Sequence, residues 1–288
     1  MINLFQDIKQ GLNFNKFKLE ELLFVEYTCP IPDEEIAIWT ESDYIIHVLS
    51  GEKTWRTIDG VIHAAPGDTV YVRKGASLMR QYFYEDFCML GFFVSNNFIK
   101  NTVNEVRGKM PLKAEEGTGD FYIGRISKTP LLHSYFQGML PYFGSDQKPA
   151  NSLLELKFKE LFISLLNSEG NEPLVRYFLN LADEGEDSLP TIMERNFIFN
   201  LSLEQYAQLC HRSLSSFKRD FQKYYNSTPG KWLLSKRLDR AAMLLHDEST
   251  NVSRVAFESG FEDTAHFSRA FKEKFGDSPL NYRKSLSA

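Results

Sequence analysis

The chain has 288 residues, with 33 Lys+Arg against 38 Asp+Glu, a formal net charge of -5, 43% hydrophobic residues and 25% charged residues. This composition is typical of a soluble globular protein and excludes disordered, collagen-like and coiled-coil chains. The length is sufficient for two domains that each bury a core. The longest apolar stretch is about seven residues, whereas a membrane span needs roughly 20, so we expect no membrane association.

The chain has three cysteines, an odd number, and they lie far apart in the sequence: Cys29, Cys88 and Cys210. Without a CxxC pair, they support neither a zinc knuckle nor a disulfide framework. Reduced thiols are typical of a cytoplasmic protein. The N-terminal sequence MINLFQDIKQ also lacks the basic and apolar regions of a secretory signal. We therefore predict a cytoplasmic location.

Residues 22–95 contain a series of short β-type segments separated by turn residues such as Gly51, Gly60 and Gly67. The segments are LLFVEYT, EIAIWTE, DYIIHVLSG, KTWRTI, DTVYVRK, LMRQYFY and CMLGFFVS. Several strands at regular spacing, with turn signals between them, predict a β-barrel or a jelly roll.

The interior of this predicted barrel has two interpretations. Alternate strand residues face inward, and a polar and aromatic subset of them could line a ligand pocket. That subset is Tyr44, Trp55, Arg73, Arg80, Tyr82 and Tyr84. The same rings could instead fill the barrel. His47 and His63 stand alone without an HxH pair, so a transition-metal site lacks ligands. We predict no metal, no cofactor and no specific ligand.

Two helical segments follow the strands. Leu153–Leu166 places apolar residues along one stripe, and Leu174–Leu181 adds a second apolar stretch. The stripe of the first segment is Leu154, Phe158, Leu161, Phe162 and Leu165. These helices could pack on the barrel, form a self-association surface of a homodimer, or do both.

The segment Ala182–Pro190 is acidic, contains Gly and Pro, and has little apolar bulk, which favours an interdomain linker. A surface loop within one domain is the alternative. Residues 189–288 hold 15 Lys+Arg and 11 Asp+Glu, a balance of +4, whereas residues 1–188 hold 18 and 27, a balance of -9. We predict domains at 1–185 and 186–288, with a polyanion contacting only the second.

The last hundred residues contain an internal repeat at an offset of 50 residues. The matched pairs are Phe217 with Phe267, Arg219 with Arg269, Phe221 with Phe271, Pro229 with Pro279 and Trp232 with Tyr282. Slightly upstream the offset is 49, which pairs Leu203 with Val252 and Ala207 with Ala256. A turn between Ala207 and Phe217 would absorb this change of one residue.

Each copy predicts a helix, a tight turn and a second helix. In the first copy Ser202 and Ser213 are placed to cap the two helices, and in the second Asp263 has the same place. We expect the second helices to bury Leu214, Phe217, Phe221 and Tyr224 in one copy, and Phe267, Phe271 and Phe275 in the other. Ser259–Gly260 supplies a left-handed turn position. Pro229 would open a connecting helix of about 17 residues, roughly 25 Å long.

This geometry favours DNA as the polyanion. A helix fits the major groove, where its N-terminal residues meet base edges, and successive groove faces recur about every 34 Å. The outer faces carry Ser215, Lys218 and Arg219 in one copy and Ser268, Arg269 and Lys272 in the other. The alternative is that these cations only solvate exposed helices. Two equivalent basic helices joined by one connector favour DNA binding.

The stretches SLEQYAQLCHRSLSSFKRDFQKYYNSTPGKWLLSKRLDRAAMLL and VSRVAFESGFEDTAHFSRAFKEKFGDSPLNYR closely resemble the DNA-binding region of the AraC/XylS family of bacterial transcription regulators. The resemblance covers residues 200–284 well, and its most specific part is Ala256–Arg283. It implies that each unit inserts its second helix into the major groove. The fragments VLSGEKTWRTIDGVIHAAPGDTVYVRKGA further resemble the cupin-type sensor domains common in this family.

The resemblance assigns base contacts position by position. The residues that it implies are Ser215, Lys218, Arg219, Thr264, Ala265, His266, Ser268 and Arg269. Ala265 has no hydrogen-bonding side chain and would contribute at most a contact with a thymine methyl group. The sequence departs from the family at His211, where the first turn usually has Gly; a positive φ at a non-Gly residue costs roughly 1 kcal/mol. His211 could instead contact a phosphate.

Three basic residues of the connecting helix have different implied roles. Arg237 matches a position that serves internal packing and ion pairing in the family, with Asp239, Asp247 and Glu248 as available partners. Lys231 and Lys236 are candidates for phosphate contacts, which set register and add affinity that depends on salt.

The sequence therefore predicts an α+β protein: an N-terminal cupin-like sensing and dimerisation domain with flanking helices, and a C-terminal all-α domain of two helix-turn-helix units joined by a long helix. We expect a sequence-specific transcription regulator that binds double-stranded DNA and activates transcription through RNA polymerase, as relatives mostly do. The expected effector of the N-terminal domain is a small molecule or a protein. The alternative is a cupin-fold metal-dependent isomerase or dioxygenase, which the missing ligand cluster disfavours.

Overall fold

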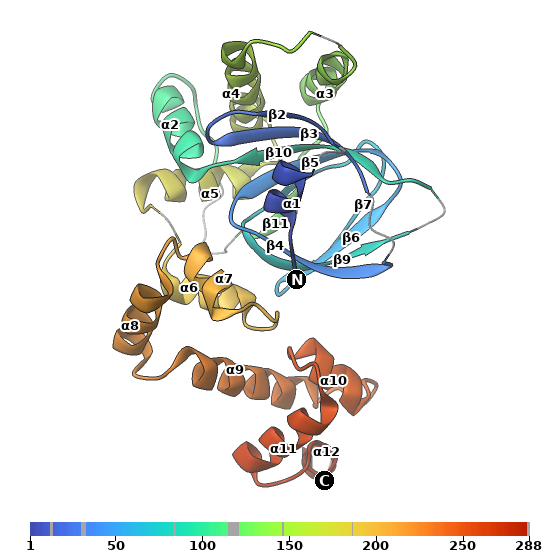
Figure 1. Cartoon of the computed structure of the whole chain (residues 1–288), viewed down its shortest axis with the longest axis vertical. Coiled ribbons are helices and arrows are strands. Elements are labelled where there is room, and N and C mark those ends of the chain that lie inside the picture. The colour runs from blue at the N-terminus through green and yellow to red at the C-terminus, as the bar shows by residue number, and fades with distance from the viewer. Residues whose placement is uncertain are drawn as a thin grey trace. The chain divides into compact units, whose positions relative to one another are not determined.

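The computed structural model describes residues 1–11, 14–29, 33–82, 85–114, 121–145, 147–185 and 187–286. The chain divides into two compact units, Met1–Asp187 and Ser188–Ala288. Within these described residues, the first unit contains all the strands and five helices, and the second contains helices only (Figure 1). The predicted α+β class, β-rich in front and all-α behind, is confirmed.

The N-terminal unit contains two β-sheets. Their strands are β1 (Ile2–Asn3), β2 (Asn15–Lys18), β3 (Leu22–Thr28), β4 (Glu35–Thr40), β5 (Asp43–Ser50), β6 (Lys53–Thr57), β7 (Gly60–Ala64), β8 (Thr69–Val72), β9 (Gly75–Gln81), β10 (Cys88–Val94) and β11 (Ile123–Arg125). The five-stranded sheet has the order β1-β4-β9-β6-β7, and the six-stranded sheet has the order β11-β8-β5-β10-β3-β2. All seven predicted segments form strands. Strands β1, β2, β7 and β11 were not predicted, because they have at most five residues each and Ala64 of β7 is the one buried residue among them.

The six-stranded sheet is buried on both faces, since alternate residues of its strands enter different cores. Leu23 and Phe93 join Trp55 and Met79 of the five-stranded sheet in one core. Their neighbours Phe24 and Phe92 lie in a second core, which the helices complete. The period of two along each strand therefore fixes which side chains meet the other sheet.

The helices described in the N-terminal unit are α1 (Leu4–Gln10), α2 (Asn96–Val106), α3 (Pro130–Phe143), α4 (Asn151–Asn167) and α5 (Glu172–Asp183). The whole predicted apolar stripe of α4 is buried, and its Phe158 ring lies 3.9 Å from that of Phe24, centroid to centroid. Packing of α4 on the sheet is therefore confirmed, while self-association stays a prediction. Among the described residues, no helix is long and apolar enough to cross a membrane.

One buried carboxylate joins three elements of this unit. Asp43, the first residue of β5, accepts hydrogen bonds from the hydroxyls of Tyr71 on β8 and Tyr177 on α5, both at 2.6 Å, and from the backbone N–H of Lys74 at 2.8 Å. Such bonds are required because an unpaired buried charge is strongly destabilising. The guanidinium of Arg73 stacks on the ring of Tyr177 at 3.9 Å and pairs with Asp187.

Two members of the predicted polar and aromatic pocket are core residues in the structure. Tyr44 and Trp55 are each 1% exposed and belong to the core between the sheets, so the rings fill the barrel, as the alternative interpretation held. Arg80 is exposed and pairs with Glu34. The remaining predicted members are Arg73, which is buried, Tyr82, which is half-buried, and Tyr84, which lies outside the described residues.

The described part of the C-terminal unit, residues 188–286, forms seven helices: α6 (Leu189–Asn196), α7 (Leu203–Leu209), α8 (Leu214–Tyr225), α9 (Pro229–Leu244), α10 (Val252–Glu258), α11 (Thr264–Phe275) and α12 (Pro279–Leu286). Helix α9 connects the α7–α8 pair to the α10–α11 pair, and Pro229 begins it as predicted. The predicted linker is shorter than expected, because α5 continues to Asp183 and α6 begins at Leu189.

We expect Phe267→Ala to lower the free energy of unfolding of the C-terminal unit by about 3–5 kcal/mol, because the ring is fully buried and its removal leaves a cavity. Urea denaturation of the full chain, followed by circular dichroism, measures the loss. The matched control is Met243→Ala, whose side chain is 73% exposed and should change stability by less than about 0.5 kcal/mol. Equal small losses in both variants would contradict the assigned buried face.

Candidate nucleic-acid interface

The two helix-turn-helix units repeat each other in their backbone hydrogen bonds. In the first turn the N–H of Arg212 donates to the carbonyl of Ala207 at 2.9 Å, and in the second the N–H of Phe261 donates to the carbonyl of Ala256 at 3.0 Å. Each turn has one residue with positive φ, His211 at 52° and Gly260 at 93°. The predicted left-handed positions are thus confirmed, and His211 adopts the conformation that glycine usually supplies.

The change of offset lies within these turns. His211 and Gly260 are 49 residues apart, whereas the helix caps Ser213 and Asp263 are 50 apart. From the caps onward the two copies stay in step. Helices α8 and α11 both have 12 residues, and both end at a left-handed residue, Asn226 or Gly276.

Capping explains why the outer helices begin where they do. The Ser213 hydroxyl accepts a hydrogen bond from the N–H of Ser216 at 3.3 Å, and the Asp263 carboxylate accepts one from the N–H of Ala265 at 2.8 Å. Each bond satisfies a backbone donor that the first helical turn leaves unpaired. The predicted caps are confirmed.

Paired phenylalanines anchor the inner faces of both outer helices. Phe217 and Phe221 of α8 are fully buried, as are the equivalent Phe267 and Phe271 of α11. The prediction was wrong at Tyr224, which is 65% exposed. Tyr225 packs in its place, with its ring centroid 4.6 Å from that of Phe221, because it stands four residues after Phe221, on the same face of the helix.

The predicted base-contacting residues lie on the opposite, outer faces. On α8, Ser215, Lys218 and Arg219 are exposed. On α11, Ala265, His266 and Arg269 are exposed, while Thr264 and Ser268 are partly buried. The residues thus form two groups, one on each equivalent helix.

Local contacts distinguish these side chains. The Ser268 hydroxyl donates to the carbonyl of Thr264 at 2.8 Å, which holds it against its own helix. The Nε of Arg269 donates to the carbonyl of Ala265 at 3.3 Å, and the Nε of Arg219 lies 3.4 Å from Asp220 Oδ1. The Arg219 side chain is 74% exposed. Both arginines can therefore extend a planar set of donors from the helix surface.

Arg237 of α9 has a structural role, but its partners differ from those predicted. Its Nε donates to the carbonyl of Phe197 at 2.7 Å and one Nη donates to the carbonyl of Phe199 at 2.9 Å. Burial lowers the pKa of Arg237, and this shift is opposed by Tyr206 and Glu262. The acidic residues proposed as partners are thus replaced by carbonyls, which only the folded chain brings to α9.

The turn between α10 and α11 has no room for a side chain at Gly260. A Cβ at this position would lie 2.7 Å from the carbonyl oxygen of Ile198 and 2.9 Å from Arg237 Nε. The segment between α6 and α7 therefore packs directly against the second turn. Sequence reasoning missed this contact, because nothing local to Ile198 marks it.

The two candidate phosphate contacts of α9 also differ. Lys236 forms an ion pair with Glu194 at 2.6 Å and lies over the ring of Trp232. Lys231 is exposed. Lys231 is therefore the better placed of the two for a phosphate.

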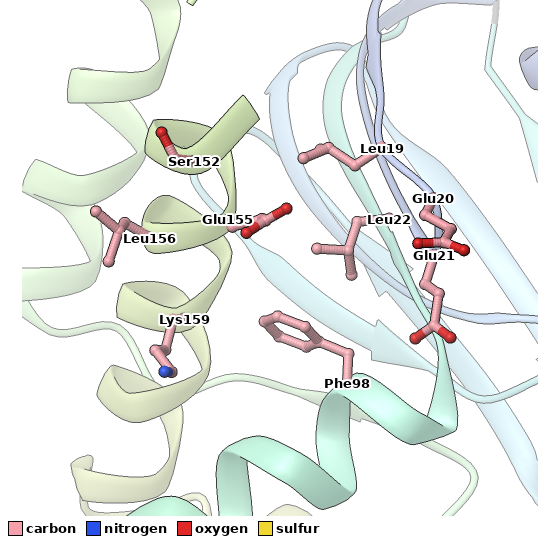
Figure 2. Close-up of a pocket in the computed structure, with 9 residues that line it drawn as sticks. All are labelled: Leu19, Glu20, Glu21, Leu22, Phe98, Ser152, Glu155, Leu156 and Lys159. Atoms are coloured by element: carbon pink, nitrogen blue, oxygen red, sulfur yellow. The ribbon is translucent and has the colours of Figure 1, made fainter. Parts of the chain in front are cut away.

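The N-terminal unit carries a groove of about 530 Å³ between α4, α2 and the turn that joins β2 to β3. Its apolar lining is Leu19, Leu22, Phe98 and Leu156, and its acidic lining is Glu20, Glu21 and Glu155. Figure 2 shows Leu22, Phe98 and Glu155 pointing into the space between α4 and the strands. Lys159 at the same groove is already paired with Glu105. The lining therefore has an apolar floor and an excess of negative charge.

No metal-binding cluster of three or more His, Cys, Asp or Glu side chains occurs within the described part of the chain. His47 is buried, with its Nδ1 at 2.9 Å from Thr69 Oγ1 and its ring stacked on Phe136. Burial, together with His133 and Lys128, lowers its pKa to about 4. His63 instead lies 3.2 Å from Glu52. His47 and His63 therefore contact different residues and do not share a site.

Comparison with known proteins agrees with both halves of this description. Residues 43–177 match the family of the ExsA N-terminal regulatory domain, and residues 206–285 match a helix-turn-helix domain family. The chain is 25% identical to the HTH-type transcriptional regulator ExsA of Pseudomonas aeruginosa over 88% of this chain and 90% of that protein. It is 20% identical to the virulence regulon transcriptional activator VirF of Yersinia enterocolitica over 91% and 96%.

These matches support an AraC/XylS family transcription regulator. The recognition from sequence is confirmed. This regulator therefore combines an N-terminal regulatory domain with a DNA-binding domain of two helix-turn-helix units. An uncharacterised HTH-type regulator of Haemophilus influenzae is 40% identical over 85 residues, which are 30% of this chain and 28% of that protein. The relatives are transcription regulators, which makes the alternative enzymatic role unsupported.

We expect Arg237→Met to lower the free energy of unfolding of the regulator by about 2–4 kcal/mol, since it removes two charge-assisted hydrogen bonds and leaves two carbonyls unpaired. The control is Lys231→Met on the same helix. Lys231 is exposed, so this change should leave the free energy of unfolding unchanged. Thermal and urea denaturation measure both. A Met variant at position 237 that is as stable as the parent, yet binds DNA less well, would move Arg237 to the DNA-contacting residues.

Proposed function

We propose that this regulator activates transcription, with residues 186–288 binding double-stranded DNA through α8 and α11 and residues 1–185 receiving a signal. The observation that carries the proposal is the pair of equivalent outer helices. Each is capped, anchored by two buried phenylalanines and exposed on a face with an arginine at the same position. If these cations only kept an exposed helix face soluble, Arg219 and Arg269 would not need to occupy the same position in both helices.

The proposed base-contacting residues are Ser215, Lys218 and Arg219 of the first unit and Thr264, Ala265, His266, Ser268 and Arg269 of the second. All lie within the first six positions of their helices, the part of a recognition helix that enters the major groove. Arginine paired with guanine is the commonest specific contact in this groove. Ser268 takes a smaller part, because its hydroxyl is bonded to Thr264.

Phosphate contacts supply the remaining affinity. Lys231 is exposed near the start of α9 and is proposed for this role, whereas the ion pair of Lys236 with Glu194 would have to open first. A contact of this kind adds salt-dependent affinity without sequence information.

The assignment as an activator rests on the similarity to the virulence regulon transcriptional activator VirF. Contact with RNA polymerase is our proposal for how activation occurs. A regulator of this kind acts where the chromosome is, so we place it in the cytoplasm of a bacterium. The alternative assignment, repression by occupying a promoter, needs the same DNA contacts but no contact with RNA polymerase.

We place the signal-receiving site at the groove of the N-terminal unit, because the barrel interior is filled by side chains such as Tyr44 and Trp55. Its volume of about 530 Å³ is within the range of small-molecule sites. The carboxylates of Glu20, Glu21 and Glu155 around an apolar floor fit an effector with a cationic group and an apolar body. A basic peptide of a protein partner has the same chemistry. Leu153 and Leu156 are exposed on the same helix, where a homodimer could also form.

A genome-wide map of bound sites gives the cognate sequence for the first test. On that duplex we expect Arg269→Ala to weaken binding by about 1–3 kcal/mol, roughly 5- to 150-fold, while binding to a random duplex stays nearly unchanged. The matched control is Arg254→Ala, because Arg254 is an exposed arginine that pairs with Glu258 on α10. Titrations at one fixed salt concentration measure all six affinities, those of the parent and the two variants on the two duplexes. Equal losses on cognate and random duplexes would remove Arg269 from the base-contacting residues.

A reporter gene placed behind a mapped site tests activation and the groove together. In a strain that lacks the native gene, the regulator should raise transcription, and Arg269→Ala should return it to background. Glu155→Gln combined with Leu156→Ala should change the response to the inducing condition while leaving DNA affinity in vitro unchanged. Glu160→Gln, which lies on α4 outside the groove lining, is the control. Transcription that falls when the regulator is present would identify a repressor.

A further inference from the structure

Lys53, the first residue of β6, is a lysine buried inside the N-terminal unit. It is 1% exposed, and lysines are almost never so deeply buried without a partner. Its Nζ lies 2.9 Å from Cys29 Sγ and 3.6 Å from Met79 Sδ. A sulfur therefore takes the place where a carboxylate is usually found.

The surroundings hold this amine and this thiol together. Lys53 Nζ lies 4.4 Å from the ring centroid of Phe87 and 5.7 Å from that of Tyr27. The Tyr27 hydroxyl donates to Cys29 Sγ at 3.4 Å, and the thiol of Cys29 donates to Gln81 Oε1 at 3.0 Å. Burial lowers the pKa of Lys53, and the contact with Cys29 opposes this shift.

The two residues come from different sheets. Cys29 follows β3 of the six-stranded sheet, while Lys53 begins β6 of the five-stranded sheet. Cys29 is half-buried, whereas Lys53 is enclosed. A covalent bond between them would join the two sheets.

We propose that Cys29 and Lys53 are an oxidation-sensitive pair in which hydrogen peroxide produces a sulfenamide cross-link between the two sheets. Peroxide first oxidises the thiol by two electrons, giving Cys29–SOH and water. The lone pair of Lys53 Nζ then attacks this sulfur, the S–N bond forms, and the S–O bond breaks. The leaving hydroxide takes a proton from the nitrogen and departs as a second water. A thiol reductant reverses the link and restores both side chains.

The test uses the purified full-length protein, treated with hydrogen peroxide and digested for mass spectrometry. We expect a cross-linked peptide pair that contains Cys29 and Lys53 and lacks two hydrogens, about 2 Da, relative to the sum of its parts. Dithiothreitol should abolish it. The oxidised protein should also melt about 6–12 °C higher, because the link closes a loop of 24 residues as a disulfide would.

Two variants and an internal control complete the design. In Lys53→Met, whose side chain is similar in length and apolar, Cys29–SOH cannot close and should be captured by dimedone in higher yield than in the parent. Cys88 is the control within the same molecule, because it is also half-buried and its Sγ lies 3.7 Å from a hydroxyl, that of Thr28. If Lys53→Met fails to fold, the peptide assay on the parent protein still decides. Equal dimedone capture of Cys29 and Cys88 in the parent, without the cross-link, would overturn the proposal.

Discussion

One left-handed residue in each turn sets the angle between the two helices of a unit, and the rest of the DNA-binding domain depends on that angle. His211 and Gly260 let the chain reverse within a single turn, so that the N–H groups of Arg212 and Phe261 reach carbonyls of the preceding helix. The caps Ser213 and Asp263 can then start the outer helices at once. Because the caps fix the first residue of each helix, they also determine which side chains face outward.

The two turns reach this conformation under different steric limits. Gly260 is packed against the carbonyl of Ile198, so a side chain has no room there. His211 is exposed, and its side chain is accommodated at a modest conformational cost. The departure of the first turn from the usual glycine is thus explained by the environment of the turn. Arg237 contributes to the difference, since it holds the segment on either side of Ile198 against α9.

Much of the fold could be predicted from the sequence, and the failures have identifiable physical causes. Period-two strands, the stripe of α4, the caps and the repeat all leave local patterns, and each was found. Strands β1, β2, β7 and β11 leave none, because they are short strands at the sheet edges with little buried area. The sequence predicted burial of Tyr224 and not of Tyr225, because two adjacent tyrosines differ only in the face of the helix on which they lie. The partners of Arg237 could not be predicted, since backbone carbonyls are present everywhere in the sequence and only folding selects two of them.

The outer faces of the two units match in position and differ in chemistry. Where α8 presents Ser215 and Lys218, α11 presents Ala265 and Ser268 at the same positions. If these faces touch bases, a single chain cannot be turned end for end on its target and make the same contacts. A bound molecule would then have polarity, and an asymmetric, non-palindromic target would suffice to orient it along the chromosome.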